Sequence, residues 1–339
     1  MQKTIPHTTL KTLYDIAQEV LRLAPWSYMK EDETFSLQAG PDGEIFYACV
    51  IGRAGISRGI VYYRGARGWD AYERVSNGTM TPEDAIQELD TLNADFEPWK
   101  NIDPDSKKRL KRLGFGPGSE LLPSPLVYSP GKAPAPPNAT DAETLIQLLR
   151  ASMPVFRRSA LDPKWLLEGP DDKLFRVLPG GDGENPAGEW LPLPEPSKPT
   201  HEAAPPDELM LARLKGKRLA PCRPWEVLVA DSGATVKEGK GAGAYFPLVM
   251  VLADSTTGFV AGFTLVPAAE MAEALPRECL KAMQTHGAQP EAFHVNREDV
   301  AAWLEPVARK MGIPVLRKGS LPMAAEAHRS LREFLGKKR

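Results

Sequence analysis

The sequence predicts an α/β protein, with an α+β N-terminal region followed by a C-terminal α/β domain that has a mixed sheet. Two observations predict this class. Amphipathic helical segments alternate with short apolar runs along all 339 residues. In the last third, five such runs fall in the order βββαβαβα, which is typical of a sheet with helical crossovers. The length favours more than one domain.

Composition and charge are those of an ordinary globular protein. Apolar residues make up 42% of the chain and charged residues 25%, and the formal net charge of −2 provides no global field that recruits nucleic acid. Cys49, Cys222 and Cys279 are far apart and form no CxxC pair, which indicates reduced thiols and no zinc site. The N-terminus lacks a signal-peptide core, and no apolar run approaches about 18 residues. We therefore expect a cytoplasmic protein without membrane contact.

Residues 1–100 are predicted to form an α+β domain. Apolar residues at helical spacing predict a helix over 8–23, which Pro25 ends. Strands are predicted over 34–39, 44–51 and 59–63, with the first two joined as a hairpin. Helices are predicted over 66–76 and 81–92, and the second begins at a Thr cap followed by proline.

Residues 101–194 are predicted to be a proline-rich extension with one helix and a hairpin. Residues 117–206 hold 18 of the 33 prolines, a density that disfavours long helices and central strands. A capping-box pattern at Thr140–Glu143 predicts a helix over 140–152. Strands over 174–178 and 189–193 are predicted to pair across a glycine-rich turn. Residues 195–220 are predicted to be a linker, semi-rigid where prolines recur.

Residues 221–339 are predicted to form a compact domain. Apolar runs over 225–230, 245–253 and 259–266, joined by short connections, predict three antiparallel strands. Strands over 292–295 and 313–316 alternate with helices over 268–285, 297–311 and 323–335. Helical crossovers of this kind place the last two strands parallel to the first.

This order resembles that of the ribonuclease-H and retroviral-integrase superfamily. There, an acid on strand one, a second after strand four and a third on a late helix bind two metal ions about 3.5–4 Å apart. The resemblance implies Asp231 as the first ligand and Glu326, after Ser320-Leu-Pro322, as the third. Asn296 stands where the second acid belongs, and an amide is a poor ligand for a hard cation, so Asp299 is the candidate substitute. The triad is therefore interpreted as degenerate.

The whole chain also resembles a group of bacterial proteins that pair an N-terminal and a C-terminal domain, both of unknown function. The N-terminal segments that carry the similarity are Ala24-Pro-Trp26, 43–52 and Arg64-Gly65, and the C-terminal segments are Tyr245-Phe-Pro247, Leu252-Ala-Asp254 and Ser320-Leu-Pro322. This resemblance supports domain boundaries and implies no chemistry.

A nucleic-acid partner would need a local basic surface. Three clusters qualify: one of Lys107, Lys108, Arg109, Lys111 and Arg112, a second of Arg213, Lys215, Lys217 and Arg218, and a third over 336–339. On a common face they would hold a phosphate backbone by counterion release, whereas each alone is typical of a solvated helix face. The glycine-rich run 239–243 is predicted to be a strand connection, because no helix follows to supply a phosphate-binding N-terminus.

Three functions follow from these patterns. The leading hypothesis is a non-catalytic binding module built on a degenerate ribonuclease-H-like domain, with no cofactor. The first alternative is a metal-dependent nuclease or strand-transfer enzyme that uses Asp231, Asp299 and Glu326 with Mg²⁺ or Mn²⁺. The second alternative is a protein-binding adaptor that does not contact nucleic acid. The sequence contains no GxSxG, Walker or Rossmann motif, which argues against common hydrolases, nucleotide-binding proteins and dehydrogenases.

Overall fold

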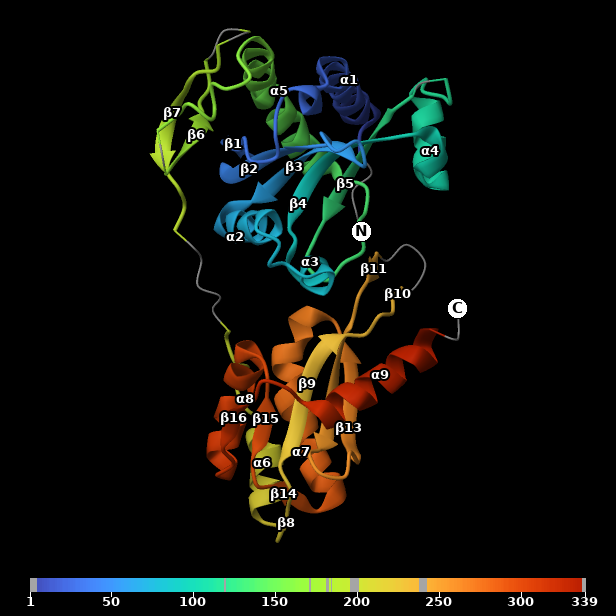
Figure 1. The fold of residues 1–339 in the computed structure, drawn as a ribbon. Helices are drawn as coiled ribbons and strands as arrows, with labels where there is room; N and C mark the ends of the chain where they lie inside the picture. Colours follow the sequence, from blue (N-terminus) through green and yellow to red (C-terminus); the bar gives the residue numbers. More distant parts are fainter. Residues whose placement is uncertain are drawn as a thin grey trace. The chain divides into compact units, whose positions relative to one another are not determined.

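The computed structural model describes residues 5–118, 120–170, 172–180, 183, 185–195, 201–237 and 243–336. The chain divides into two compact units (Figure 1). Unit 1 comprises Met1–Pro130 and Pro134–Ser197, and unit 2 comprises Gly131–Ala133 and Lys198–Arg339. Both units mix helices and strands, which confirms the predicted α/β class. Over the described ranges, no helix is long and apolar enough to cross a membrane.

Unit 1 is built on a seven-stranded mixed sheet with the order β5-β4-β3-β2-β1-β6-β7. Its strands are β1 (Phe35–Ala39), β2 (Glu44–Ile51), β3 (Arg58–Arg64), β4 (Thr91–Glu97), β5 (Leu122–Tyr128), β6 (Lys173–Val177) and β7 (Gly188–Pro192). Neighbouring strands are antiparallel except β1 and β6, which pair in parallel.

Helices cover both faces of this sheet. The helices are α1 (His7–Leu23), α2 (Gly65–Ser76), α3 (Pro82–Glu88), α4 (Pro104–Arg112) and α5 (Ala139–Leu161), with short 3₁₀ turns at Pro25–Ser27 and Trp99–Asn101. On one face α1 and α5 bury the main core, in which Phe35, Tyr62 and Phe156 are fully enclosed. On the other face α2 packs Trp69 and Tyr72 against β2 and β3.

Two features of unit 1 differ from the predictions. Residues 101–194 do not form a separate extension, because β5, β6 and β7 join the sheet of residues 1–100 and α5 covers it. The helix predicted over 81–92 ends at Glu88, and residues 91–97 form β4. The prolines of β5 are tolerated because β5 is the edge strand of the seven-stranded sheet, next to β4.

Unit 2 is built on a five-stranded mixed sheet with the order β13-β12-β9-β15-β16. Its strands are β9 (Trp225–Asp231), β12 (Leu248–Asp254), β13 (Val260–Val266), β15 (Phe293–Val295) and β16 (Val315–Arg317), and the short ladders are β8 (Ala220–Cys222) with β14 (Ala288–Pro290) and β10 (Val236–Lys237) with β11 (Ala244–Tyr245). β9, β12 and β13 are antiparallel, whereas β15 pairs in parallel with both β9 and β16.

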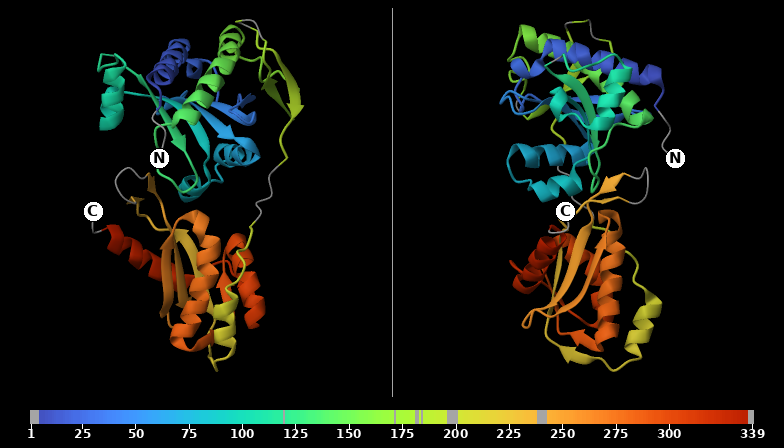
Figure 2. Two further views of the ribbon diagram at one scale, coloured as in Figure 1. Left: turned by 180° about the vertical axis from the view of Figure 1, so that it is seen from behind. Right: turned by 90° about the vertical axis from the view of Figure 1, so that its right-hand side faces the viewer.

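Helices also cover both faces of the second sheet. They are α6 (Glu208–Lys215), α7 (Met271–His286), α8 (Glu298–Met311) and α9 (Pro322–Gly336), with a 3₁₀ turn at Ala268–Glu270. The residues of α6, α7 and α8 share one core, and α9 packs on the opposite face (Figure 2).

The segment predicted to be a linker is partly folded. Residues 208–215 form α6, which buries Leu211 and Leu214 in the core of unit 2, because these two leucines lie on one face of the helix. Three other predictions concern residues outside the described ranges: the linker at 196–200, most of the glycine-rich run at 239–242, and the basic C-terminus at 337–339.

Candidate functional site

Asp231 lies at the end of β9, as the strand pattern predicts, and its carboxylate closes a local turn. Its Oδ1 accepts a hydrogen bond of 2.7 Å from the backbone amide of Gly233. Its carbonyl accepts one of 2.9 Å from Nε2 of His328 on α9. The side chain is 9% exposed. Such a turn is the ordinary structural use of an aspartate after a strand.

Asp299 is held by an arginine. It lies in the first turn of α8 and is 9% exposed. Its Oδ1 accepts hydrogen bonds from Nε of Arg297 at 3.0 Å and from the backbone amide of Val300 at 2.8 Å. Nη1 of Arg297 also donates to the carbonyl of Val229 on β9 at 3.3 Å. A guanidinium therefore links β9 to the start of α8 and neutralises the carboxylate proposed as the second metal ligand.

Glu326 lies on the solvent side of α9. Its side chain is 62% exposed and forms an ion pair of 2.8 Å with Arg329, one helical turn away. The residues of α9 that pack on the sheet include Leu321 and Ala324. Within the described parts of the chain, no group of three or more His, Cys, Asp or Glu side chains is placed to hold a metal ion. The residues present do not fit the two-metal site that the superfamily resemblance implies.

A buried carboxylate that the sequence reasoning missed lies at the other end of β9. Glu226 is 4% exposed and its Oε2 accepts a hydrogen bond of 2.8 Å from the backbone amide of Ala324, in the first turn of α9. His294 pairs with Glu226 across β15 and β9. Burial and Lys318 lower the pKa of His294, against a smaller opposing effect of Glu226. The available signal was a single acid inside an otherwise apolar run.

The first basic cluster lies on α4, whose Leu110 packs into unit 1. Nζ of Lys107 and of Lys111 lie 5.9 Å and 5.8 Å from the ring centroid of Trp99. Lys108 forms an ion pair with Asp105. Lys108, Lys111 and Arg112 are exposed, and Lys107 and Arg109 are half-buried. The cluster therefore combines an aromatic ring with several cations.

The second basic cluster lies in unit 2. Arg213, Lys215, Lys217 and Arg218 are all exposed on α6 and the turn after it. The two clusters belong to different units. Their convergence on a common face therefore stays a prediction.

An apolar surface, defined here by Phe259, Val260, Phe263 and Leu265, lies on the edge strand β13 and the residue before it. These side chains are 57%, 40%, 57% and 39% exposed, respectively. Phe263 and Leu265 pair with Val251 and Val249 of β12, respectively. These two valines pack against α9, so Phe263 and Leu265 lie on the same face of the sheet as α9. An edge strand with several exposed apolar side chains is typical of an interaction surface.

Comparisons with known proteins give two family matches and a weak likeness to a solved structure. No curated protein matches the chain. The solved structure of the catalytic core domain of BIV integrase is similar to 34% of this chain and 70% of its own, with 17% identity and a TM-score of 0.24. Residues 11–176 match a Domain of unknown function (DUF7309), and residues 210–332 match another (DUF6930). These matches confirm the predicted pairing, and the chain therefore combines these two domains of unknown function.

Proposed function

We propose that this chain is a non-catalytic binding protein whose second unit is a ribonuclease-H-like domain without two-metal chemistry. The proposal rests on the hydrogen bonds of Arg297. Its guanidinium donates to the carboxylate of Asp299 and also to the carbonyl of Val229 on β9. A cation paired with one of the expected metal ligands disfavours a second positive charge beside that carboxylate. The pairing of the five strands supports the ribonuclease-H-like assignment. The free cysteines fit a cytoplasmic location.

A thermal melt of the purified chain with millimolar Mg²⁺ or Mn²⁺ tests this proposal. A ligand that binds only the folded state raises the midpoint, so a metal site would be visible without an activity assay. We expect the wild type and Asp231→Asn to respond equally to either ion. Asn retains an oxygen for the amide of Gly233, so the variant should fold. A rise in the wild type that is lost in the variant would favour the nuclease instead.

The α4 cluster is the surface that we propose for a nucleic-acid backbone. Cations beside an aromatic ring provide phosphate contacts and a stacking platform. We expect labelled single-stranded oligonucleotides to bind with an affinity that falls as salt rises. Replacing Lys107 and Lys111 with Gln should weaken binding and reduce the salt slope by about 1–2. Replacing Lys11 and Arg22 of α1 with Gln removes the same charge and is the control. Binding that is absent or independent of salt contradicts the proposal.

A protein partner at β13 is the second candidate, favoured by its exposed apolar side chains. An open edge strand accepts a strand from another chain through backbone hydrogen bonds. A photocrosslinking side chain at Phe263 should then capture one defined protein, whereas the same group at the exposed Thr256 should not. Equal labelling from both positions would eliminate this candidate.

A further inference from the structure

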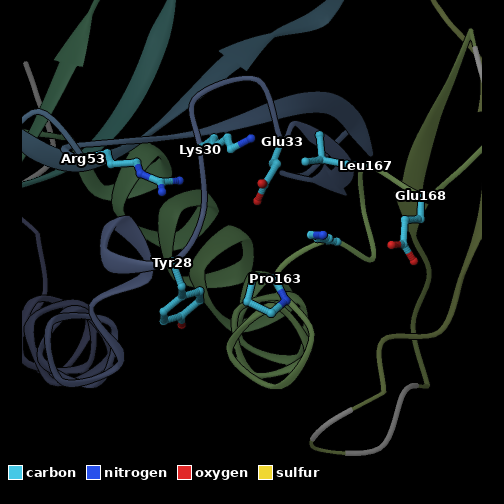
Figure 3. A pocket seen from close by; sticks show the side chains of 8 residues that line it. Tyr28, Lys30, Glu33, Arg53, Pro163, Leu167 and Glu168 are labelled. Carbon is cyan, nitrogen blue, oxygen red and sulfur yellow. The ribbon is translucent and has the colours of Figure 1, made fainter.

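Unit 1 contains a cavity that none of the functions above uses. It has a volume of about 280 Å³ and is lined by Tyr28, Lys30, Glu33, Arg53, Pro163, Lys164, Leu167 and Glu168 (Figure 3). These residues come from three connections: α1 to β1, the β2–β3 turn, and the segment after α5. Its volume is near the lower limit of small-molecule sites.

Each connection is fixed by the surrounding fold. In the first, the carbonyl of Glu31 accepts hydrogen bonds from Sγ of Cys49 at 3.3 Å and from the hydroxyl of Tyr72 at 3.2 Å. In the second, Arg53 directly follows Gly52, whose φ is +129°. A side chain at position 52 would place its Cβ 2.7 Å from the carbonyl oxygen of Ser57, so the turn requires glycine there. In the third, Nε1 of Trp165 donates to the hydroxyl of Ser159 at 2.7 Å. The cavity is therefore built on anchored backbone.

One oxygen of the Glu33 carboxyl is unsatisfied. Its side chain is 3% exposed, and its Oε2 is buried with no hydrogen-bond partner among the described residues. Burial raises the pKa of this carboxyl, against opposing effects of the Lys30 backbone and of the Lys30 and Arg53 charges. The hydroxyl of Tyr28, which also lines the cavity, is buried without a partner in the described structure. Unmet buried polar groups are costly to a fold, and they are typical of a site that a ligand completes.

Three cations accompany Glu33. Lys30, Arg53 and Lys164 are exposed, and over the described ranges none has an ion pair within 4.0 Å. In Figure 3, the guanidinium of Arg53 and the carboxylate of Glu33 extend into the same space from different connections. The cavity thus offers a buried acceptor and an exposed rim that carries these three cations and the carboxylate of Glu168.

We propose that this cavity binds a small zwitterion of the α-amino-acid class. The ammonium group donates to the buried Glu33, and the carboxylate lies against Arg53 and the rim lysines. Charge-assisted hydrogen bonds of both kinds are stronger than neutral ones, so both ends of the ligand contribute. This site lies in unit 1 and does not depend on the function proposed for unit 2.

Thermal melts and titration calorimetry of the full chain test the proposal, with each free L-amino acid as the probe at matched ionic strength. At least one amino acid should raise the midpoint in a saturable manner. Its N-acetyl derivative, which lacks the ammonium, and its amide, which lacks the carboxylate, should each bind about tenfold or more weakly. If no amino acid exceeds the salt control, or if the N-acetyl derivative binds equally well, the proposal is wrong.

Two carboxylate variants separate binding from folding. Glu33→Gln should abolish the shift caused by the amino acid, yet leave the midpoint of the empty protein unchanged or higher, because it removes a buried carboxyl with one unpartnered oxygen. Glu31→Gln, an exposed residue in the same connection, should retain binding. Wild-type affinity in Glu33→Gln would overturn the assignment, and a large loss of stability in that variant would indicate a structural role instead.

Discussion

Buried and half-buried carboxyl groups in this chain differ in how well hydrogen bonds and ion pairs stabilise their charged form. Glu226 accepts from a helix amide, and Asp299 is paired with an arginine. Asp95, on the central part of β4, has less support. The pKa of its carboxyl is raised to about 7, mainly by burial and to a smaller extent by the nearby Glu97, against the opposing effect of a hydrogen bond with Asn93. Asp95 is therefore a source of pH-dependent instability in unit 1.

Replacing Asp95 with Asn should stabilise the protein at neutral pH. The unfolded carboxyl titrates near 3.8 and the folded one near 7, so the folded state retains the proton to higher pH. The free energy of unfolding therefore falls as pH rises through this interval, with an upper limit of about 4 kcal/mol. We expect Asp95→Asn to gain about 1–3 kcal/mol at pH 8 and nothing at pH 3. Urea unfolding at both pH values measures this difference.

The exposed Asp42 provides the control for this pH dependence. Asp42→Asn removes the same charge from a surface turn and should leave the pH profile within about 0.5 kcal/mol of the wild type. If Asp95→Asn retains the wild-type loss of stability between pH 4 and pH 7, another group is responsible.

At the scale of elements, α2 approaches β3 closely because Gly68 has no side chain. A Cβ at this position would lie 2.7 Å from the carbonyl carbon of Tyr63 and 3.1 Å from its Cβ. These are backbone-fixed atoms, so the helix itself would have to move. Trp69 and Tyr72, which follow on α2, would then lose their packing against Tyr47 and Tyr63.

Replacing Gly68 with Ala should therefore destabilise unit 1. Alanine improves helix propensity by about 1 kcal/mol, but overpacking typically costs about 1–3 kcal/mol or more. We expect a net loss of about 1–2 kcal/mol in urea unfolding, with weaker near-ultraviolet signals from the displaced aromatic rings. Gly118→Ala is the matched control, since nothing lies within 4 Å of a Cβ there. An equal effect of both substitutions would show that crowding at Gly68 is not the cause.

The sequence indicated most elements, and the exceptions have physical causes. In unit 2, the run at 225–230 is apolar because both faces of β9 are covered, so the pattern alone shows a central strand. β4 was missed because Thr91, Asn93 and Asp95 form a polar face on a buried strand, which resembles an exposed segment. β5 was missed because its prolines disfavour strands except at an edge, and edge position is a tertiary property.

At the scale of the whole molecule, the sequence pattern predicts on which strand or helix an acidic residue lies, but it does not predict which groups its carboxylate contacts. Asp231 was correctly placed at a strand end, yet whether its carboxylate serves a metal or a turn depends on the partners that the fold supplies. The cavity around Glu33 gave no sequence signal, because its walls come from three separate connections, and the one after α5 lies more than a hundred residues from the other two. Sites built from one motif are visible in a sequence, whereas sites assembled from separate connections require the fold.

The two units have separate cores, which predicts separate unfolding transitions. Leu92 lies in the core of unit 1 and Leu252 in the core of unit 2, and both are fully buried. Replacing either leucine with Ala removes the same atoms. Each substitution should lower the free energy of unfolding of its own unit by about 2–5 kcal/mol. We expect calorimetry to show two transitions, with Leu92→Ala lowering one midpoint and Leu252→Ala the other, each by roughly 5–15 °C. A single transition that both variants lower equally would mean that the units unfold as one cooperative body, whatever the separation of their cores.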